Sequence, residues 1–169
     1  MSLECDDAKE HGPQTSLDLA IEIFGPPTTV VESGGIWVDP ITGAAEPKVH
    51  AHWRLCQTTK TPEQHKQLRE VRVMAARLLG ADATAGSSVH PLRCPGSWHK
   101  KAEPRMARIR HIDNRYELEL PAAYARVCEI YDAVGWQIRR NKPAVERPTS
   151  PEAHSELQQA GVCSRRNSQ

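Results

Sequence analysis

The segment KVHAHWRL at residues 48–55 places the strongest constraint on the fold, because apolar and polar side chains alternate along it without a break. Successive side chains of a β-strand point to opposite faces, so this pattern predicts a strand with one packed face and one polar face. The predicted packed set is Val49, Ala51, Trp53 and Leu55, and the predicted polar set is Lys48, His50, His52 and Arg54. A sheet built on such a strand needs a covering layer on one side only.

Three segments are predicted to be helices, at residues 14–24, 62–80 and 122–134. The second has the clearest start, because Thr61-Pro62-Glu63-Gln64 combines a capping-box pattern with a proline at the first helical position. The first ends at Gly25-Pro26-Pro27, which cannot continue a helix.

Further strands are predicted from β-branched or alternating runs, with a loop at 39–47. The ranges are 3–5, 28–33, 36–38, 106–112 and 116–120. Strands and helices alternate irregularly, which is typical of an α+β fold or an α/β sandwich with a mixed sheet flanked by helices.

The length of 169 residues suits one domain, which we expect at residues 1–140. The strand at 3–5 stands at the start of the sequence, so this domain is expected to lack N-terminal strands. Residues 141–169 are rich in Pro, Ser, Glu and Arg and have almost no apolar periodicity, which predicts a disordered tail or linker.

Charge and cysteine usage exclude several classes of protein. The net charge is only +1, so any nucleic-acid binding must depend on local charge. The five cysteines form no C-x-x-C pair, which argues against a zinc knuckle and for a reducing compartment. No apolar run approaches the roughly 20 residues that span a bilayer, so we expect no membrane association and a cytoplasmic location.

The segment LRCPGSWHKK at residues 92–101 gathers a Pro-Gly turn, a serine hydroxyl and several cationic side chains. Such a set of donors suits a phosphate group. The alternative is an ordinary solvated basic loop, in which Trp98 only packs against the turn.

Glu4 and Asp6 in LECDD are two residues apart, so they share a face if the strand continues through Asp6. Two carboxylates on one face could hold a divalent cation, although a solvated strand end gives the same pattern.

Taken in order, these segments resemble a known family. The sequence shows E-C-D, then TTVVESGG, then H-A-H-W-R-L, then a long helix ending in GAD, and then R-C-P-G-S-W-H-K-K. This order is similar to that of the primase-polymerase domain of the archaeo-eukaryotic primase superfamily, in its plasmid and phage branch of RepB-like DNA primases. The resemblance covers about residues 3 to 120, and its most specific part is R-x-P-G-S-x-H-x-K. It implies an RRM-like core.

The resemblance implies a nucleotidyltransferase that joins nucleoside triphosphates on a single-stranded DNA template with Mg²⁺ or Mn²⁺. By position it implies Glu4, Asp6 and Asp82 as metal ligands and His50 as a further catalytic residue that contacts the nucleotide phosphates. The phosphate-binding set it implies is His50, Arg93, Ser97, His99 and Lys101, and the DNA-binding set is Lys48, Arg54, Trp98 and Lys100. Some positions depart from the family pattern. Glutamate replaces the commoner aspartate at position 4, and Lys48 replaces a small hydroxyl residue. Ser97 and His99 stand where relatives often carry threonine and asparagine.

Four alternatives remain open. Asp113 could replace Asp82 as the third carboxylate. His50 and His52 could simply form the polar face of their strand. They could also be the metal-binding pair of a rolling-circle nickase, with Tyr124 or Tyr131 as the nucleophile. Finally, the chain could be an inactive fragment that binds single-stranded DNA. A replicative helicase would be a separate chain or a missing part, because the sequence has no G-x-x-x-x-G-K-[ST] loop.

Overall fold

The computed structural model describes residues 1–5, 11–81, 86 and 92–134 of the chain. The chain divides into two units, Met1–Gln137 and Ile138–Gln169, and every described residue belongs to the first. The predicted tail at 141–169 therefore lies outside the described residues and stays a prediction.

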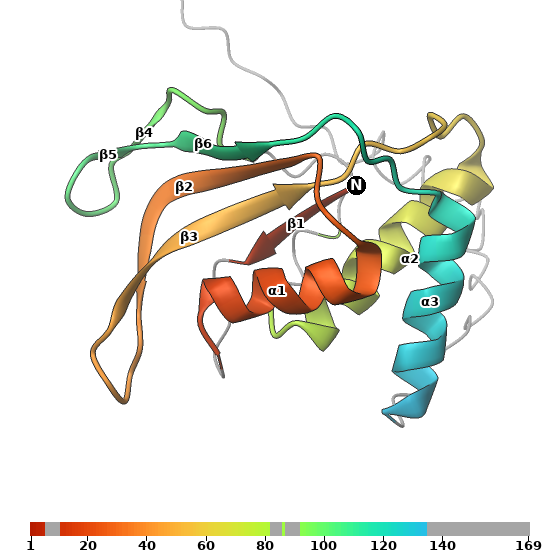
Figure 1. Ribbon diagram of the computed structural model, residues 1–169, viewed down its shortest axis with the longest axis horizontal. Helices are drawn as coiled ribbons and strands as arrows, with labels where there is room; N and C mark the ends of the chain where they lie inside the picture. Colours follow the sequence, from red (N-terminus) through yellow and green to blue (C-terminus); the bar gives the residue numbers. More distant parts are fainter. Residues whose placement is uncertain (6–10, 82–85, 87–91, 135–169) are drawn as a thin grey trace, which may run out of the picture. The chain divides into compact units, whose positions relative to one another are not determined.

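The centre of the first unit is a four-stranded sheet with the strand order β1-β3-β2-β6 (Figure 1). The strands are β1 (Ser2–Cys5), β2 (Thr29–Val38), β3 (Ala45–His52) and β6 (Arg108–Ile112). Neighbouring strands in this sheet are antiparallel. A parallel pairing occurs only as an isolated bridge between Leu55 and Leu118 in the part of the chain that is described.

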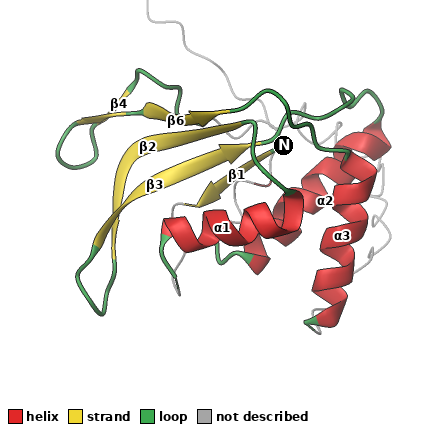
Figure 2. Ribbon diagram, viewed as in Figure 1, coloured by secondary structure: helices red, strands yellow, loops and turns green. Residues whose placement is uncertain are grey.

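Three helices lie on one side of this sheet (Figures 1 and 2). They are α1 (Pro13–Phe24), α2 (Pro62–Leu78) and α3 (Leu120–Ala133). The predicted capping box is confirmed, because Thr61 accepts a hydrogen bond from the Gln64 backbone and the Gln64 side chain bonds back to the Thr61 backbone. The three helices together with the antiparallel sheet confirm the expected α+β class.

The predicted packed face of 48–55 is confirmed at its centre. Val49, Ala51 and Trp53 are buried, and the Trp53 ring meets Phe24 of α1 edge to face at 5.6 Å between centroids. Trp53 Nε1 also donates to Gly25 O at 2.9 Å. The side chains of Val49 and Ala51 in β3 therefore face the helices, and the alternate side chains of this strand face away from them.

The order β1-α1-β2-β3-α2 follows the first five elements of the split βαβ arrangement. Its pairings set β3 between β1 and β2, so the polar face of β3 lies at the middle of the sheet. None of the helices described here has the length and apolar character needed to cross a membrane.

Two strands predicted at 28–33 and 36–38 form a single strand, β2, with an irregularity between Glu32 and Ile36. Gly34 has φ +81 at this irregularity, a conformation that glycine adopts without strain. The loop predicted at 39–47 is shorter, because Asp39 Oδ1 accepts hydrogen bonds from the Ile41 and Thr42 backbones and closes a tight turn before β3.

The strand predicted at 116–120 is wrong. Only Leu118 pairs, donating to Arg54 O while its own carbonyl accepts from Cys56 N. Helix α3 begins directly after it because Pro121 occupies the first turn.

The strand predicted at 106–112 is interrupted at the buried Ala107, whose N–H donates to Ser97 O. Its first part becomes β5 (Arg105–Met106), which pairs with β4 (Trp98–His99) in a separate two-stranded sheet. The segment after the break is β6.

Candidate functional site

The polar face of the sheet brings together two segments that were assigned to the site from sequence. In the β1–β3 register Glu4 is the partner of His50, and Ser2 is the partner of His52. Directly opposed residues on antiparallel strands have Cβ atoms roughly 4.5–5.5 Å apart. Ser2 Oγ and His52 Nδ1 share a hydrogen bond of 2.8 Å, which fixes the second pair. Pairing of the strands thus sets a carboxylate opposite an imidazole.

His50 is 4% exposed, although a simple alternation predicts a solvated polar face. Its neighbour His52 has its pKa lowered from 6.5 to about 4, mainly by burial and further by electrostatic interactions with His50, the N-terminal amino group and Arg72. At neutral pH His52 is therefore uncharged, which is the form of imidazole that acts as a hydrogen-bond acceptor or as a metal ligand.

Arg72 of α2 is a site residue that sequence reasoning missed. It is 8% exposed, and burial lowers its pKa while the negative charge of Glu4 raises it. A buried arginine is rare unless a charge partner offsets its lost hydration. The only sequence signal is its place beside Val71 on the inner side of α2, where the helical pattern otherwise gives apolar residues.

The predicted metal set is described only in part. Asp6 and Asp82 lie outside the described residues, and Glu4 is half-buried near the positive charge of Arg72. No group of three His, Cys, Asp or Glu side chains that could hold a metal occurs within 1–5, 11–81, 86 and 92–134. The fit of the three carboxylates to a divalent cation stays a prediction.

The basic segment makes the Pro95–Gly96 turn directly before β4, at the base of the β4–β5 hairpin. Gly96 has φ +87, and its N–H donates to Ala107 O. Ser97 Oγ donates to Cys94 O at 2.6 Å, so this hydroxyl is used within the turn.

Arg93, His99 and Lys101 of the basic segment were also assigned to phosphate binding. Arg93 Nη1 donates to Trp98 O at 3.2 Å, which ties it to the hairpin backbone. His99 is half-buried, whereas Lys100 and Lys101 are exposed. The two lysines therefore remain accessible to an anion.

Two glycines of β2 connect the hairpin with the polar face. A Cβ on Gly34 would lie 2.8 Å from Arg105 O and 3.0 Å from His99 Cβ, so the hairpin packs directly on this glycine. A Cβ on Gly35 would lie 3.0 Å from Lys48 Cδ. Because Lys48 and His50 are two residues apart on β3, the SGG segment joins the hairpin to the histidine pair.

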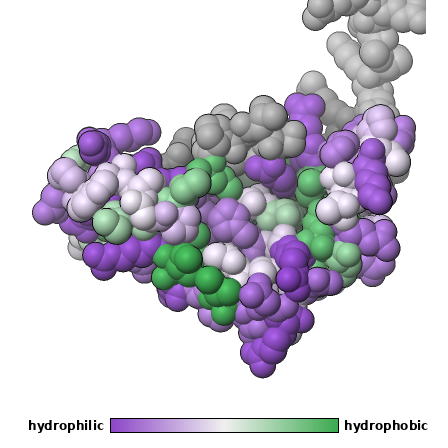
Figure 3. Space-filling model, turned by 90° about the horizontal axis from the view of Figure 1, so that it is seen from above, coloured by the Kyte–Doolittle hydropathy of each residue, from purple (hydrophilic) through white to green (hydrophobic). Residues whose placement is uncertain are grey.

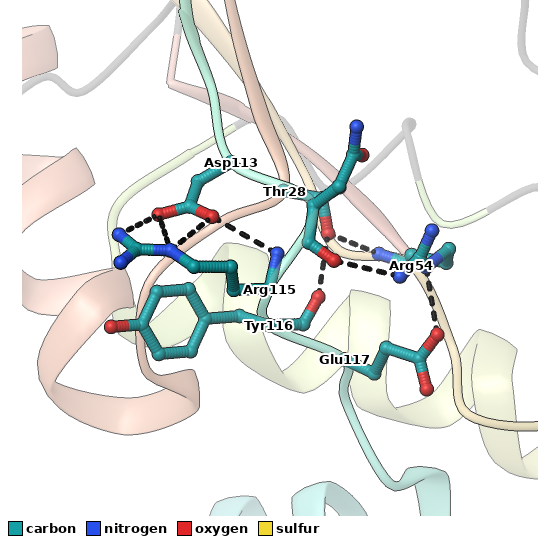
Figure 4. Close-up of polar contacts among 7 residues, drawn as sticks. Thr28, Arg54, Asp113, Arg115, Tyr116 and Glu117 are labelled. Atoms are coloured by element: carbon teal, nitrogen blue, oxygen red, sulfur yellow. Dashed lines mark hydrogen bonds and ion pairs between the residues drawn. The ribbon is translucent and has the colours of Figure 1, made fainter.

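Arg54 was predicted to bind DNA, and its contacts are structural (Figure 4). Its Nε lies 2.9 Å from Glu117 Oε1, and its Nη2 donates to Asn114 O at 2.8 Å. Its backbone N–H donates to Thr28 Oγ1, which in turn donates to Tyr116 O. These bonds fasten the loop after β6 to the ends of β2 and β3.

Asp113, the alternative third carboxylate, is held by Arg115. Its Oδ2 lies 2.6 Å from Arg115 Nη2, and side-chain and backbone hydrogen bonds from Arg115 lower its pKa to about 2. Arg115 also lies over the Tyr116 ring at 5.7 Å. The carboxylate is thus already satisfied by a guanidinium.

Neither tyrosine of α3 is placed like a nucleophile. Tyr124 donates to Glu70 Oε2 at 3.1 Å, and burial together with this hydrogen bond raises its pKa to about 12. Tyr131 is 3% exposed and accepts a hydrogen bond from Arg77 Nη1. Both contacts join α3 to α2 on the helical side of the sheet, away from the His50 and His52 side chains.

The exposed strand β6 adds basic residues that were not assigned from sequence, namely Arg108 and Arg110. The R-I-R spacing in MARIRHI was the available signal.

Searches of protein-family models, curated proteins and solved structures find no match for this chain.

Proposed function

We propose that this chain is a primase-polymerase-type nucleotidyltransferase domain of a plasmid or phage replication system. Its substrates would be nucleoside triphosphates and a single-stranded DNA template, and its location would be cytoplasmic. A replicative helicase on another chain would supply unwinding.

The observation that supports this proposal is the register that sets Glu4 opposite His50. The two residues come from different segments of the resemblance, and the SGG segment then connects them to the basic hairpin. The pairing of Glu4 with His50 thus brings together residues from distant parts of the sequence, as a single nucleotide site requires.

In the proposed site the chain's own residues would bind and orient the phosphates. His50 would donate a hydrogen bond to a phosphate oxygen, and Lys100 and Lys101 would offset its negative charge. Bound Mg²⁺ or Mn²⁺, held by Glu4 together with Asp6 and Asp82, would stabilise the charge that develops during phosphoryl transfer.

A second candidate is a domain that binds single-stranded DNA without catalysis. The charge of Arg72 beside Glu4 favours it, because a fixed positive charge near a carboxylate opposes the binding of a cation there. Lys100 and Lys101 of the hairpin would keep their phosphate-binding role in this case.

Nucleotide incorporation on single-stranded DNA distinguishes the two candidates. The protein is incubated with circular single-stranded DNA, labelled nucleoside triphosphates and Mn²⁺, with and without a primer. Glu4→Gln should reduce incorporation at least about 100-fold, since changes even to the outer shell of a metal site typically cost 10–100-fold. Glu22→Gln, an exposed change on α1, is the matched control and should have no effect. Equal incorporation by Glu4→Gln and the parent would contradict the proposal.

A further inference from the structure

The segment from 93 to 116 concentrates positive charge in a chain that is nearly neutral. It holds seven Lys and Arg residues and only two carboxylates. Both carboxylates are used internally, because Glu103 pairs with Arg105 at 2.7 Å and Asp113 pairs with Arg115.

Four cations of this segment have no hydrogen-bond or ion-pair partner among the residues that the structure describes. They are Lys100, Lys101, Arg108 and Arg110. All four are exposed. Like charges gathered in this way repel one another, and an anionic partner relieves that repulsion.

Arg108, one of these cations, lines a cleft of about 660 Å³ between β2 and the β4–β5 hairpin. Its volume falls within the roughly 300–1,000 Å³ of sites for small ligands. The residues that matter here are Glu32, Gly34, Gly35, Trp98, Arg105 and Arg108.

Trp98 lines this cleft and is 52% exposed, paired across the hairpin with Met106, which is 38% exposed. Exposed apolar residues continue along β6, at Ile109 and Ile112. Figure 3, seen from the side that carries β4, β5 and β6 in Figure 1, shows hydrophobic residues directly beside hydrophilic ones. An exposed indole next to arginines is the combination with which proteins stack bases and bind the strand backbone.

We infer that the cleft and β6 form a binding surface for single-stranded nucleic acid, with one base stacked on Trp98 and the adjoining phosphates on Arg108 and Arg110. The inference rests on the proposed function only in taking a nucleic-acid strand as the ligand, and it needs neither metal nor nucleotide. The Glu103–Arg105 pair at the rim is an exposed ion pair of the kind that contributes little, so Arg105 can exchange this partner for a phosphate.

Fluorescence anisotropy of a labelled 20-nucleotide oligo-dT, measured in EDTA with the full chain, tests the surface. Trp98→Leu should weaken binding about five- to hundredfold, which is the usual range for loss of one stacked base. Trp98→Phe should keep most of the affinity, because it keeps a ring that stacks. Ile41→Ala is the matched apolar control, since Ile41 is 92% exposed at the tip of the β2–β3 hairpin.

The double change Arg108→Ala/Arg110→Ala should weaken binding and lower the log-log salt slope by about 1.4, since each phosphate contact on a single strand contributes about 0.7. Arg126→Ala on α3 removes an exposed guanidinium from the helical layer and should leave affinity and slope unchanged.

Unchanged affinity in both Trp98→Leu and the arginine double variant would overturn the inference, and so would equal losses in Trp98→Leu and Trp98→Phe. Because the assay contains no metal or nucleotide, a chain that binds here but incorporates no nucleotide contradicts the proposed function and leaves this surface intact. If the parent incorporates nucleotides while the variants bind the strand as well as the parent does, the proposed function is supported and this inference is overturned.

Discussion

Glu4 on β1 lies directly opposite His50 on β3. The half-buried carboxylate interacts electrostatically with Arg72, and the imidazole is almost fully buried in the middle of the sheet. Because strand pairing brings this carboxylate and this imidazole together, the pair is the place to test for bound metal.

Replacement of Glu4 by Gln should remove the stabilisation that Mn²⁺ gives to the folded protein. A cation that binds only the folded state at 100 times its Kd adds about 2.7 kcal/mol to the free energy of unfolding, and each kcal/mol raises Tm by roughly 2–4 °C for a chain of this size. Thermal melts with increasing Mn²⁺ should therefore show a rising Tm for the parent and for Glu22→Gln, but little change for Glu4→Gln. A similar rise in all three proteins would show that the cation binds elsewhere.

His52 should make the fold sensitive to mild acid. Its pKa is about 4 in the folded protein and 6.5 when unperturbed, so between these values the unfolded chain binds more protons than the folded one. The free energy of unfolding then falls as the pH is lowered from 6.5 towards 4. Above pH 6.5 His52 is neutral in both the folded and the unfolded chain, so none of this stability is lost there.

Urea unfolding at a series of pH values checks this expectation. His52→Gln keeps a partner for Ser2 Oγ but does not titrate, so its free energy of unfolding should depend less on pH in that window. Other titrating groups are common to both proteins and cancel in the comparison. Parallel pH profiles would rule out His52 as the source of acid sensitivity.

Gly34→Ala should separate the hairpin from β2. The new Cβ would meet Arg105 O at 2.8 Å in a backbone conformation with φ +81, so both a clash and strain oppose it. We expect a loss of about 1–3 kcal/mol in the free energy of unfolding, measured in urea. Gly43→Ala is the matched control, because Gly43 has φ +73 but nothing within 4 Å of the added atom. Equal losses for the two variants would mean that the close approach contributes nothing.

Arg54→Ala should affect stability more clearly than DNA binding. The guanidinium is shared between Glu117 and Asn114, and its ion pair is about half exposed, so the loss should be on the order of 1 kcal/mol. Oligonucleotide affinity should fall less than it does for Arg108→Ala/Arg110→Ala. A larger fall in affinity for Arg54→Ala would restore the DNA-binding role predicted for this residue from sequence.

Local patterns were sufficient to predict the elements whose signals lie within a few residues. The capping box at Thr61 and the alternation at 48–55 predicted α2 and the packed face of β3, because helix caps and strand parity depend on neighbouring backbone and side-chain atoms. The irregular succession of predicted strands and helices indicated the α+β class.

Long-range pairing decided the rest. The YELEL segment has the alternation of a strand, yet Leu118 finds only one bridge partner and Pro121 starts a helix, so tertiary context overrides local propensity. The burial of Arg72 and the packing of the hairpin on Gly34 likewise depend on elements far apart in the sequence.

The sequence by itself therefore determined which residues of β1 and β3 share a face, because the side-chain period of a strand is two. Only the tertiary structure decided that Glu4 meets His50. A shift of one residue in strand pairing would turn every side chain to the other face, and the burial of Val49 and Ala51 against the helices excludes such a shift.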